Sequence, residues 1–446
     1  MNLSWLVRNK VFQTLMVSLP SLISSFVVGI CIVQILGPEG KGALGLISFN
    51  IELFVLILGL SIGSAITYFI ANKKIRAGKI MTISLIVIAA GAIIVGAAYM
   101  ISDWLGYNVI IYSEEFLSPV VIFYFFLIYF LTIFKHISIA FLQGFHKITW
   151  INRITLYTAI INFLIIAPLF IYLLYGGDLA SKQNFEIVIE LLMVANVIAA
   201  LPILHYLNKA IHEKGLKPEG FKLKDDFFPL MRFAFIGHLS NVVNFFNYRI
   251  DIWFISFFFY AQFDTLSFYL VAVTLSQIIW QIPTAINLVY FPRLCENPSI
   301  ALTIRITRLN TFLVSVVSII GLLVAPYLIP KLYGGKFEAS IFPFQLLLIG
   351  IFFSSLSKTI ASFIFAKGKV NINLIATIVG LLVTLVLDYF LIPVYGIVGA
   401  AWATNITYFS IFLVCLTYIW IVAKKEDRGA KVLSIFVPGS FRIPTE

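Results

Sequence analysis

The sequence has little charge and little cysteine. Charged residues make up 11% of the 446, against about 25% in ordinary soluble domains. The three cysteines, Cys31, Cys295 and Cys415, show no paired spacing, so they indicate neither disulfides nor a metal site. We find no nucleotide-binding loop, zinc motif or nucleic-acid-binding module. We therefore expect no enzyme, no cofactor and no nucleic-acid partner.

Apolar sequence is what the chain has in excess. Hydrophobic residues make up 61%, and the mean hydropathy is +1.02. Because a helix needs about 20 apolar residues to cross a bilayer, we can draw twelve spans. They lie at 11–36, 42–71, 80–101, 117–144, 153–175, 186–207, 228–258, 265–291, 309–330, 341–366, 371–392 and 396–423. The sequence predicts an all-α polytopic membrane protein with twelve transmembrane helices.

The two halves of the chain resemble each other. Ala65-Ile66 matches Ala285-Ile286, and Tyr175-Gly176 matches Tyr395-Gly396, at spacings near half the chain length. Such repeats are typical of transporters whose substrate site lies between two lobes near the bilayer midplane. We expect two pseudo-symmetric six-helix lobes, at 1–207 and 228–423, with a cytoplasmic linker at 208–227 and a cytoplasmic tail at 424–446.

Lysine and arginine are distributed unevenly among the predicted loops. Most of the 31 fall in alternate loops, including 73–79 and the linker. Because short cytoplasmic loops retain positive charge during insertion, this pattern places both termini in the cytoplasm. The net charge of +11 then reflects insertion bias and anionic lipid headgroups rather than nucleic acid.

Two lysines lie within predicted spans at equivalent positions of the repeat. Lys135 belongs to the fourth span and Lys358 to the tenth. A lysine at a helix centre costs about 2.5 to 3.5 kcal/mol on insertion scales, so each needs a polar surrounding. We hypothesise that both line a central cavity and attract an anionic substrate. The alternative is that each side chain snorkels to the cytoplasmic interface.

Other ionisable residues within the spans are candidates for substrate or ion binding. Arg249 is the better candidate for the cavity, while Asp251, two residues further along the same helix, cannot be assumed to pair with it. Glu52, Asp251 and Asp388 could each bind a coupling proton or sodium ion, and Glu52, which we place deepest in the membrane, is the preferred candidate. For each acid, a structural hydrogen bond or ion pair is an equally good interpretation.

Several short motifs resemble one family of membrane proteins. These motifs include Ile35-Leu-Gly-Pro-Glu-Gly40, Arg249-Ile-Asp251, and the segment from Ile392 to Ala401. The chain is similar to oligosaccharide-lipid flippases of the polysaccharide exporter branch, in the superfamily that includes the MATE drug antiporters and the lipid II flippases. The resemblance covers about residues 10 to 423 and implies a MATE-like fold.

The resemblance implies a function as well. An isoprenoid-pyrophosphate-linked oligosaccharide would move from the cytoplasmic to the outer leaflet of the bacterial inner membrane by alternating access, with cation coupling and with polysaccharide polymerase machinery as a partner. Lys135, Arg249 and Lys358 would then meet pyrophosphate or acidic sugar. The rivals are a cation-coupled drug antiporter of the MATE type, a lipid II flippase and a membrane-embedded glycan-processing enzyme.

Overall fold

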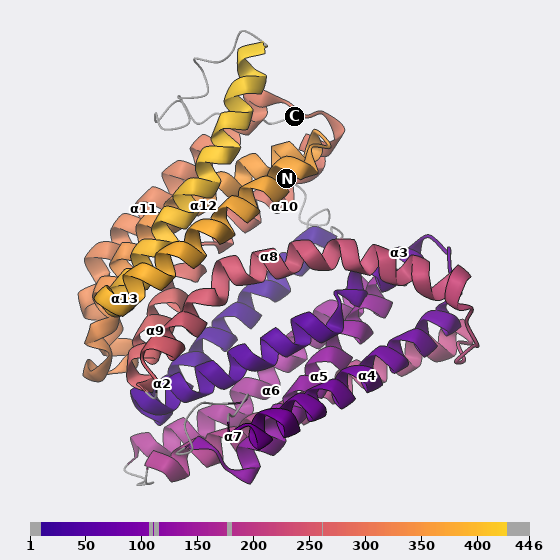
Figure 1. Cartoon of the computed structure of the whole chain (residues 1–446), viewed down its shortest axis with the longest axis horizontal. Coiled ribbons are helices and arrows are strands. Elements are labelled where there is room, and N and C mark those ends of the chain that lie inside the picture. Colours follow the sequence, from indigo (N-terminus) through magenta and orange to yellow (C-terminus); the bar gives the residue numbers. More distant parts are fainter. Residues whose placement is uncertain (1–9, 107–109, 111–115, 176–180, 261, 426–446) are drawn as a thin grey trace. The chain divides into compact units, whose positions relative to one another are not determined.

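The chain is all-helical in the part that the structure describes. The structure is a computed structural model that describes residues 10–106, 110, 116–175, 181–260 and 262–425 (Figure 1). Within these ranges nine helices are long and apolar enough to cross a membrane. This confirms the predicted all-α membrane class, whereas the count of twelve spans stays a prediction.

The residue contacts divide the chain into two units, Met1–Val242 and Val243–Glu446. The N-terminal unit contains the first elements of the chain in order. They are α2 (Lys10–Gly59), α3 (Ile62–Ala71), α4 (Ala77–Trp104), α5 (Pro119–Gly144), α6 (Ile148–Leu174), α7 (Ser181–Lys214), the short π-helix η2 (Leu223–Phe227) and the first part of α8 (Phe228–Phe258). The predicted boundaries of the lobes, the linker and the tail stay predictions.

The C-terminal unit contains the rest of α8 and the elements that follow. They are α9 (Phe263–Ile278), α10 (Gln281–Glu296), α11 (Ile300–Tyr333), the 3-10 helix η3 (Gly335–Ser340), α12 (Ile341–Ala366) and α13 (Val370–Lys425). The predicted single span at 265–291 is two helices, because the chain turns at Ile279 and Trp280. Pro283 lies just after this turn and cannot donate the backbone hydrogen bond that would continue one helix through it.

Two helices are too long for one crossing. Helix α2 has 50 residues and α13 has 56, which at 1.5 Å per residue is about 75 Å or more, over twice the roughly 30 Å hydrocarbon core. Each is interrupted at a glycine with positive φ, at Gly37 (φ 65°) and Gly396 (φ 59°). Glycine adopts this conformation without a Cβ clash. Both interruptions coincide with predicted span ends.

Helix α12 packs closely against α13 in the C-terminal unit. The side chain of Asn405 joins them, because its Oδ1 accepts from the Gly350 backbone N–H at 2.8 Å and its Nδ2 donates to the Leu346 carbonyl at 2.9 Å. A Cβ on Gly350 would lie 2.4 Å from that Oδ1. The close approach therefore requires glycine. Buried Leu356, Ile360 and Phe412 belong to the same core.

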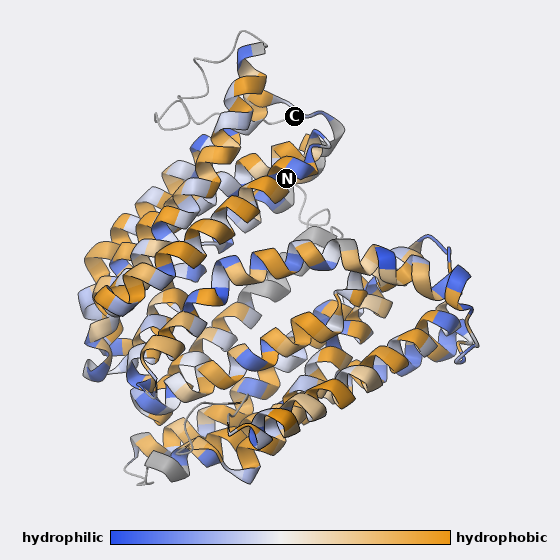
Figure 2. Ribbon diagram, viewed as in Figure 1, coloured by the Kyte–Doolittle hydropathy of each residue, from blue (hydrophilic) through white to orange (hydrophobic). Residues whose placement is uncertain are grey.

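Large apolar side chains also cover the outside of both units. Ile93, Phe123 and Leu323 are among many that are exposed. Figure 2 shows apolar residues along the middle of the helices and hydrophilic residues gathered near helix ends and loops. In water so much exposed apolar surface would drive association, whereas in a bilayer it contacts lipid.

Candidate functional site

Lys358 is held in place within the C-terminal unit. It lies on α12, and its Nζ donates to Thr284 Oγ1 on α10 at 2.8 Å. The same ammonium lies 5.8 Å from the centre of the Trp280 ring, within the range of a cation–π interaction. Asn287 Nδ2 donates to the Lys358 carbonyl at 3.4 Å. The turn between α9 and α10 thus presents Trp280 and Thr284 to this lysine.

Lys358 lines a cavity of about 290 Å³. The cavity volume is close to the lower end of small-molecule sites, which start near 300 Å³. The lining combines amides, hydroxyls and aromatic rings with the one ammonium group. Its polar members are Asn244, Ser354, Ser357, Asn373 and Thr377. No carboxylate is among the described residues that line it, so the cavity suits an anionic or neutral polar group rather than a cation.

Three aromatic rings form one wall of this cavity. Tyr248 lies edge-to-face with Trp280 at 5.0 Å between ring centres and with Tyr408 at 6.0 Å. Trp280 and Tyr408 are 5.9 Å apart. Such contacts fix the rings against each other. Together with the adjacent hydroxyls and amides they form a rigid surface that could contact a sugar.

Two buried aspartates of the C-terminal unit lie near each other. Asp251 on α8 accepts a short hydrogen bond from the Tyr269 hydroxyl and one from the Ile252 backbone N–H at 2.8 Å. The Tyr269 hydroxyl is also 3.3 Å from Thr404 Oγ1. Asp388 on α13 is fully buried and close enough to Asp251 for their charges to interact.

The surroundings of the two aspartates differ. Neither carboxylate oxygen of Asp388 has a hydrogen-bond partner within the described ranges, whereas both oxygens of Asp251 are bonded. An isolated carboxylate is costly to keep charged when it is buried. Asp388 is therefore suited to take up a proton or a small cation, with Asp251, Tyr269 and Thr404 supplying nearby oxygens.

The other predicted site residues are placed as follows. Arg249 is half-buried on α8, and its charge interacts with that of Asp251, a pairing that the sequence alone did not allow us to assume. Lys135 is half-buried on α5 of the N-terminal unit and makes no hydrogen bond or ion pair with the residues that the structure describes. Glu52 is exposed on α2 of that unit. The hypothesis that Lys135 and Lys358 line one central cavity stays a prediction.

Sequence reasoning missed several residues of this site. Trp280 and Thr284 were not singled out as site residues because they were assigned to the interior of one continuous helix, and Tyr248, Tyr269 and Tyr408 were assigned no role in a site. One signal was available. Pro283 within an apolar span indicates a break, and side chains beside a break in a membrane helix often contribute to a site.

Fold and site together define a class. Helices arranged in two units, with a cation and two buried carboxylates inside the second, are typical of a membrane transporter. A family model for "Polysaccharide biosynthesis protein" matches residues 7–297. The chain therefore belongs to this family of polysaccharide biosynthesis proteins, as its motifs predicted.

Solved structures of the same fold belong to one superfamily. The chain is similar to the lipid II flippase MurJ in an inward closed conformation, with 17% identity, a TM-score of 0.68 and coverage of 95% of this chain and 92% of that one. It is similar to an inward-facing MATE family multidrug resistance transporter of the MOP superfamily, with 14% identity, a TM-score of 0.65 and coverage of 94% and 99%. It is also similar to an outward-facing MATE family multidrug resistance transporter of the MOP superfamily, with 15% identity, a TM-score of 0.60 and coverage of 95% of this chain and 98% of that one.

These similarities confirm the predicted MATE-like fold. The three structures are named as one flippase and two transporters. A search of curated proteins found no match.

Proposed function

We propose that this protein is a flippase that moves an isoprenoid-pyrophosphate-linked oligosaccharide from the cytoplasmic to the outer leaflet of the bacterial inner membrane. The observation that carries this proposal is the cavity at Lys358. A fixed ammonium beside amides, hydroxyls and three aromatic rings offers partners for both a phosphate and a sugar. Membership of the polysaccharide biosynthesis family supplies the biological class of the substrate.

Transport proceeds by alternating access in this proposal. Structures of the same fold are named as inward closed, inward-facing and outward-facing, so the fold is compatible with such a cycle. Both termini lie in the cytoplasm, as the distribution of basic residues favours. The polymerase machinery remains the expected partner, because a glycan delivered to the outer leaflet is a substrate for polymerisation.

Coupling to a proton or sodium ion takes place at Asp388 and Asp251. A buried carboxylate that lacks a hydrogen-bond donor changes its local environment strongly when it gains a proton or a cation. Thr404 lies on α13 with Asp388, and Tyr269 lies on α9. Binding of a proton or cation by the two aspartates would therefore change the contacts of both helices. Glu52, the other coupling candidate, is less suited because its side chain is exposed.

A cation-coupled drug antiporter of the MATE type is the second candidate. It is favoured by the fold and by the buried acidic pair, which would serve either function. Lys358 separates the two proposals, because an ammonium in the cavity repels cationic drugs and attracts anionic headgroups. A glycan-processing enzyme is disfavoured because the described lining of the cavity contains no acid for catalysis.

The test is reconstitution of the purified protein in liposomes with a fluorescent lipid-linked glycan and an imposed proton or sodium gradient. We expect outward movement that depends on one of the two gradients. The Lys358→Ala variant should lose most of this movement. Lys367→Ala is the matched control, because Lys367 directly follows α12 and interacts with the Phe363 ring instead of lining the cavity. Movement of a cationic drug and not of the glycan would instead support the antiporter.

A further inference from the structure

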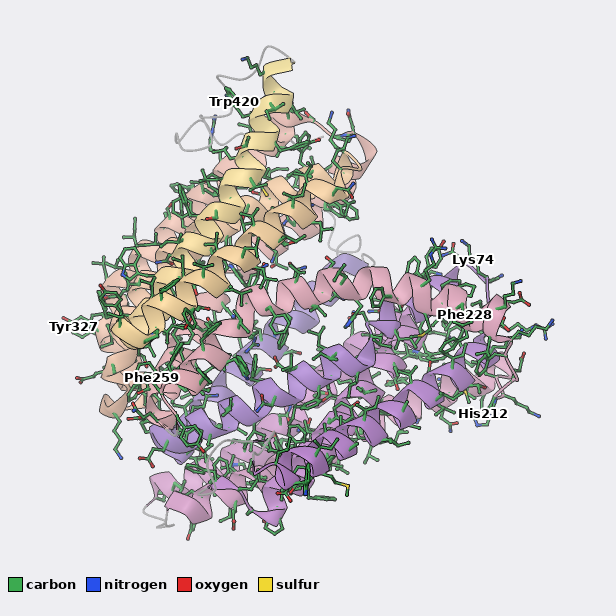
Figure 3. All side chains as sticks on the ribbon, viewed as in Figure 1. Lys74, His212, Phe228, Phe259, Tyr327 and Trp420 are labelled. Atoms are coloured by element: carbon green, nitrogen blue, oxygen red, sulfur yellow. The ribbon has the colours of Figure 1, made fainter. Side chains whose placement is uncertain are left out.

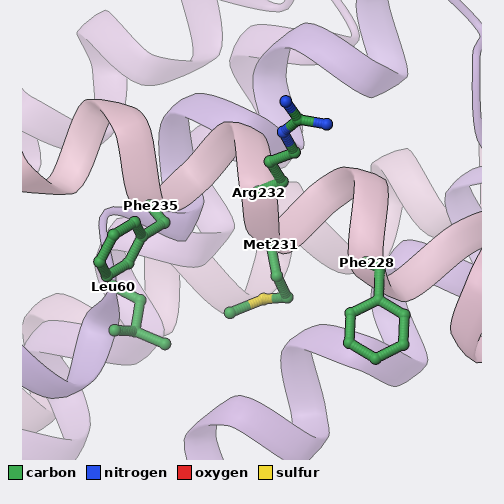
Figure 4. Close-up of a pocket in the computed structure, with 5 residues that line it drawn as sticks. All are labelled: Leu60, Phe228, Met231, Arg232 and Phe235. Atoms are coloured by element: carbon green, nitrogen blue, oxygen red, sulfur yellow. The ribbon is translucent and has the colours of Figure 1, made fainter.

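A pair of adjoining hollows lies in the N-terminal unit, away from the residues assigned above. One hollow has a volume of about 480 Å³ and is lined by three cations, Lys74, Lys224 and Arg232, together with aromatic rings. The other, of about 680 Å³, is lined mainly by apolar side chains (Figure 4). Phe228 and Arg232 line both, so the two hollows adjoin along this part of α8.

The cations of the first hollow have no acidic partner among the residues that the structure describes. Lys74 Nζ donates to the Tyr68 hydroxyl at 2.6 Å and lies 4.7 Å from the centre of that ring, while Tyr68 stacks on Phe233 with a ring separation of 4.5 Å. Lys224 and Arg232 make no hydrogen bond or ion pair with the residues that the structure describes. Three positive charges thus converge without compensation.

Acidic residues are close in sequence but are committed elsewhere. Asp226 binds Lys79 at 2.8 Å, Glu219 lies 3.7 Å from Arg76, and Asp225 lies 3.9 Å from Lys222. No carboxylate lines either hollow within the described ranges. The segment that joins α7 to α8 therefore pairs its acids with other cations and leaves Lys224 available for an external anion.

The second hollow offers an apolar surface directly beside these cations. Phe228, Met231 and Phe235 lie along one face of α8, while the Arg232 guanidinium points to the other side of that helix in Figure 4. Phe228 and Phe235 are each 61% exposed. Figure 3 places Lys74 and Phe228 at the same end of the N-terminal unit. This arrangement matches a molecule with an anionic head and an apolar chain.

The wall of the second hollow is formed by a strained segment. Leu60 and Ser61 both have positive φ, at 47° and 48°, a conformation that costs about 1 to 2 kcal/mol for each residue with a side chain. The strained turn is fixed by hydrogen bonds, because Asn241 Nδ2 donates to Ser61 Oγ at 2.9 Å and Ser64 Oγ donates to the Ser61 carbonyl at 2.9 Å. Strain held in this way often marks a binding or switching site.

We propose that these hollows bind the pyrophosphate-linked isoprenoid at the cytoplasmic face before it reaches the transport cavity. The pyrophosphate lies among Lys74, Lys224 and Arg232, and the first part of the isoprenoid chain lies on Phe228, Met231 and Phe235. A pyrophosphate diester carries two negative charges, which suits three cations, whereas a phospholipid such as phosphatidylglycerol carries one. The choice of this lipid rests on the proposed function, while the match of charge and apolar surface does not.

The experiment measures binding to the full-length protein in detergent by native mass spectrometry. The probes are a long-chain isoprenyl pyrophosphate without sugars, phosphatidylglycerol and inorganic pyrophosphate. The variant is Lys224→Gln with Arg232→Gln. The matched control is Lys214→Gln with Lys217→Gln, at the end of α7 and shortly after it, because neither lysine lines either hollow. All these side chains are at least partly exposed, and thermal unfolding verifies that each variant is folded.

We expect the isoprenyl pyrophosphate to bind wild type and the control equally and the Lys224/Arg232 variant about 10- to 100-fold more weakly, because two charge-assisted contacts are lost. Phe228→Ala with Phe235→Ala should weaken the same lipid and leave inorganic pyrophosphate unchanged. Equal binding by the Lys224/Arg232 variant, or binding of phosphatidylglycerol as tight as that of the isoprenyl pyrophosphate, would overturn the proposal.

The outcome can be separated from that of the proposed function. The Lys358→Ala variant should keep full binding at these hollows while losing transport. Binding without transport in wild type would refute the flippase and leave this site standing. Transport in wild type with unchanged binding in the Lys224/Arg232 variant would refute this site and leave the flippase standing.

Discussion

The repeat-equivalent lysines on α5 and α12 have different surroundings. Lys358 is fixed by Thr284 and by the Trp280 ring, whereas Lys135 makes no hydrogen bond or ion pair within the described ranges and has His136 beside it in sequence. In the proposed mechanism the two equivalent lysines therefore have different uses. We infer that Lys358 binds a defined group and that Lys135 contributes charge without a fixed position.

The acidic residues within the helices also differ between the two units. The C-terminal unit holds Asp251 and Asp388 close together and buried, while Glu52 in the N-terminal unit is exposed. In the proposed mechanism, ion coupling is therefore assigned to the second unit. The N-terminal unit instead presents its charges at the surface, in the ion pairs of the segment before α8 and in the hollow at Lys224.

The largest effect is expected from Asp388→Asn. Because the amide cannot exchange a proton and binds a cation poorly, gradient-driven transport should fall to the level of protein-free liposomes. Flux under proton and sodium gradients is the measurement. Glu52→Gln is the control from the other unit and should keep at least half of the flux. Loss of flux in Glu52→Gln with flux retained in Asp388→Asn would assign ion coupling to the N-terminal unit instead.

A second prediction compares the two lysines directly. Lys358→Ala should reduce the transport rate about 10- to 100-fold, as expected when an interaction of 1.5 to 3 kcal/mol with a charged group is lost. Lys135→Ala should reduce it less, because that ammonium has no fixed geometry to lose. Initial rates in proteoliposomes at subsaturating glycan give both values. Equal losses would show that the unlike surroundings have no functional meaning.

A third prediction concerns the packing of α12 against α13 within the C-terminal unit. Gly350→Ala should destabilise the protein by about 1 to 3 kcal/mol, since the added Cβ would overlap Asn405 and force a core rearrangement. Gly96→Ala on α4 has open space around it and should be neutral or raise stability by up to about 1 kcal/mol. Thermal unfolding in detergent measures the difference. Equal effects would argue against the close contact of α12 with α13.

The smallest effect is expected at the ion pair of Lys79 with Asp226. Burial opposes ionisation of Asp226, but the Lys222 backbone N–H and the Lys79 ammonium outweigh it and hold the pKa of this carboxyl below its usual value of 3.8. A lowered pKa in the folded state means that the stabilisation is complete above pH 3.8 and is lost as pH falls through the lower, folded value.

Asp226→Asn removes this contribution at every pH. The variant should unfold at a lower temperature than wild type at pH 7, by a shift equivalent to about 1 to 2 kcal/mol, and the difference should disappear as pH falls well below 3.8. Differential scanning fluorimetry across this range is the measurement. A difference that grows with acidity would contradict the assigned sign.

Much of the fold could be predicted from apolar runs. The span at 341–366 matches α12, and 228–258 matches α8, because Lys367 ends the first run and Asp225 and Asp226 precede the second. The break at Ile279 and Trp280 was not predicted, since apolar residues continue across it and hydropathy does not register a turn. Lys358 and Asp251 could be chosen by their cost in a membrane. Their partners could not, because Trp280, Thr284 and Tyr269 are distant in sequence and carry no such cost.

The measurement that tests the central claim most directly is the outward flipping of a lipid-linked glycan by the Lys135→Ala, Lys358→Ala double variant in proteoliposomes. The protein should insert, remain folded and show no flipping above protein-free liposomes, while the Lys367→Ala control flips at the wild-type rate. Flipping by the double variant at the wild-type rate would contradict the claim that these lysines draw an anionic headgroup through the protein.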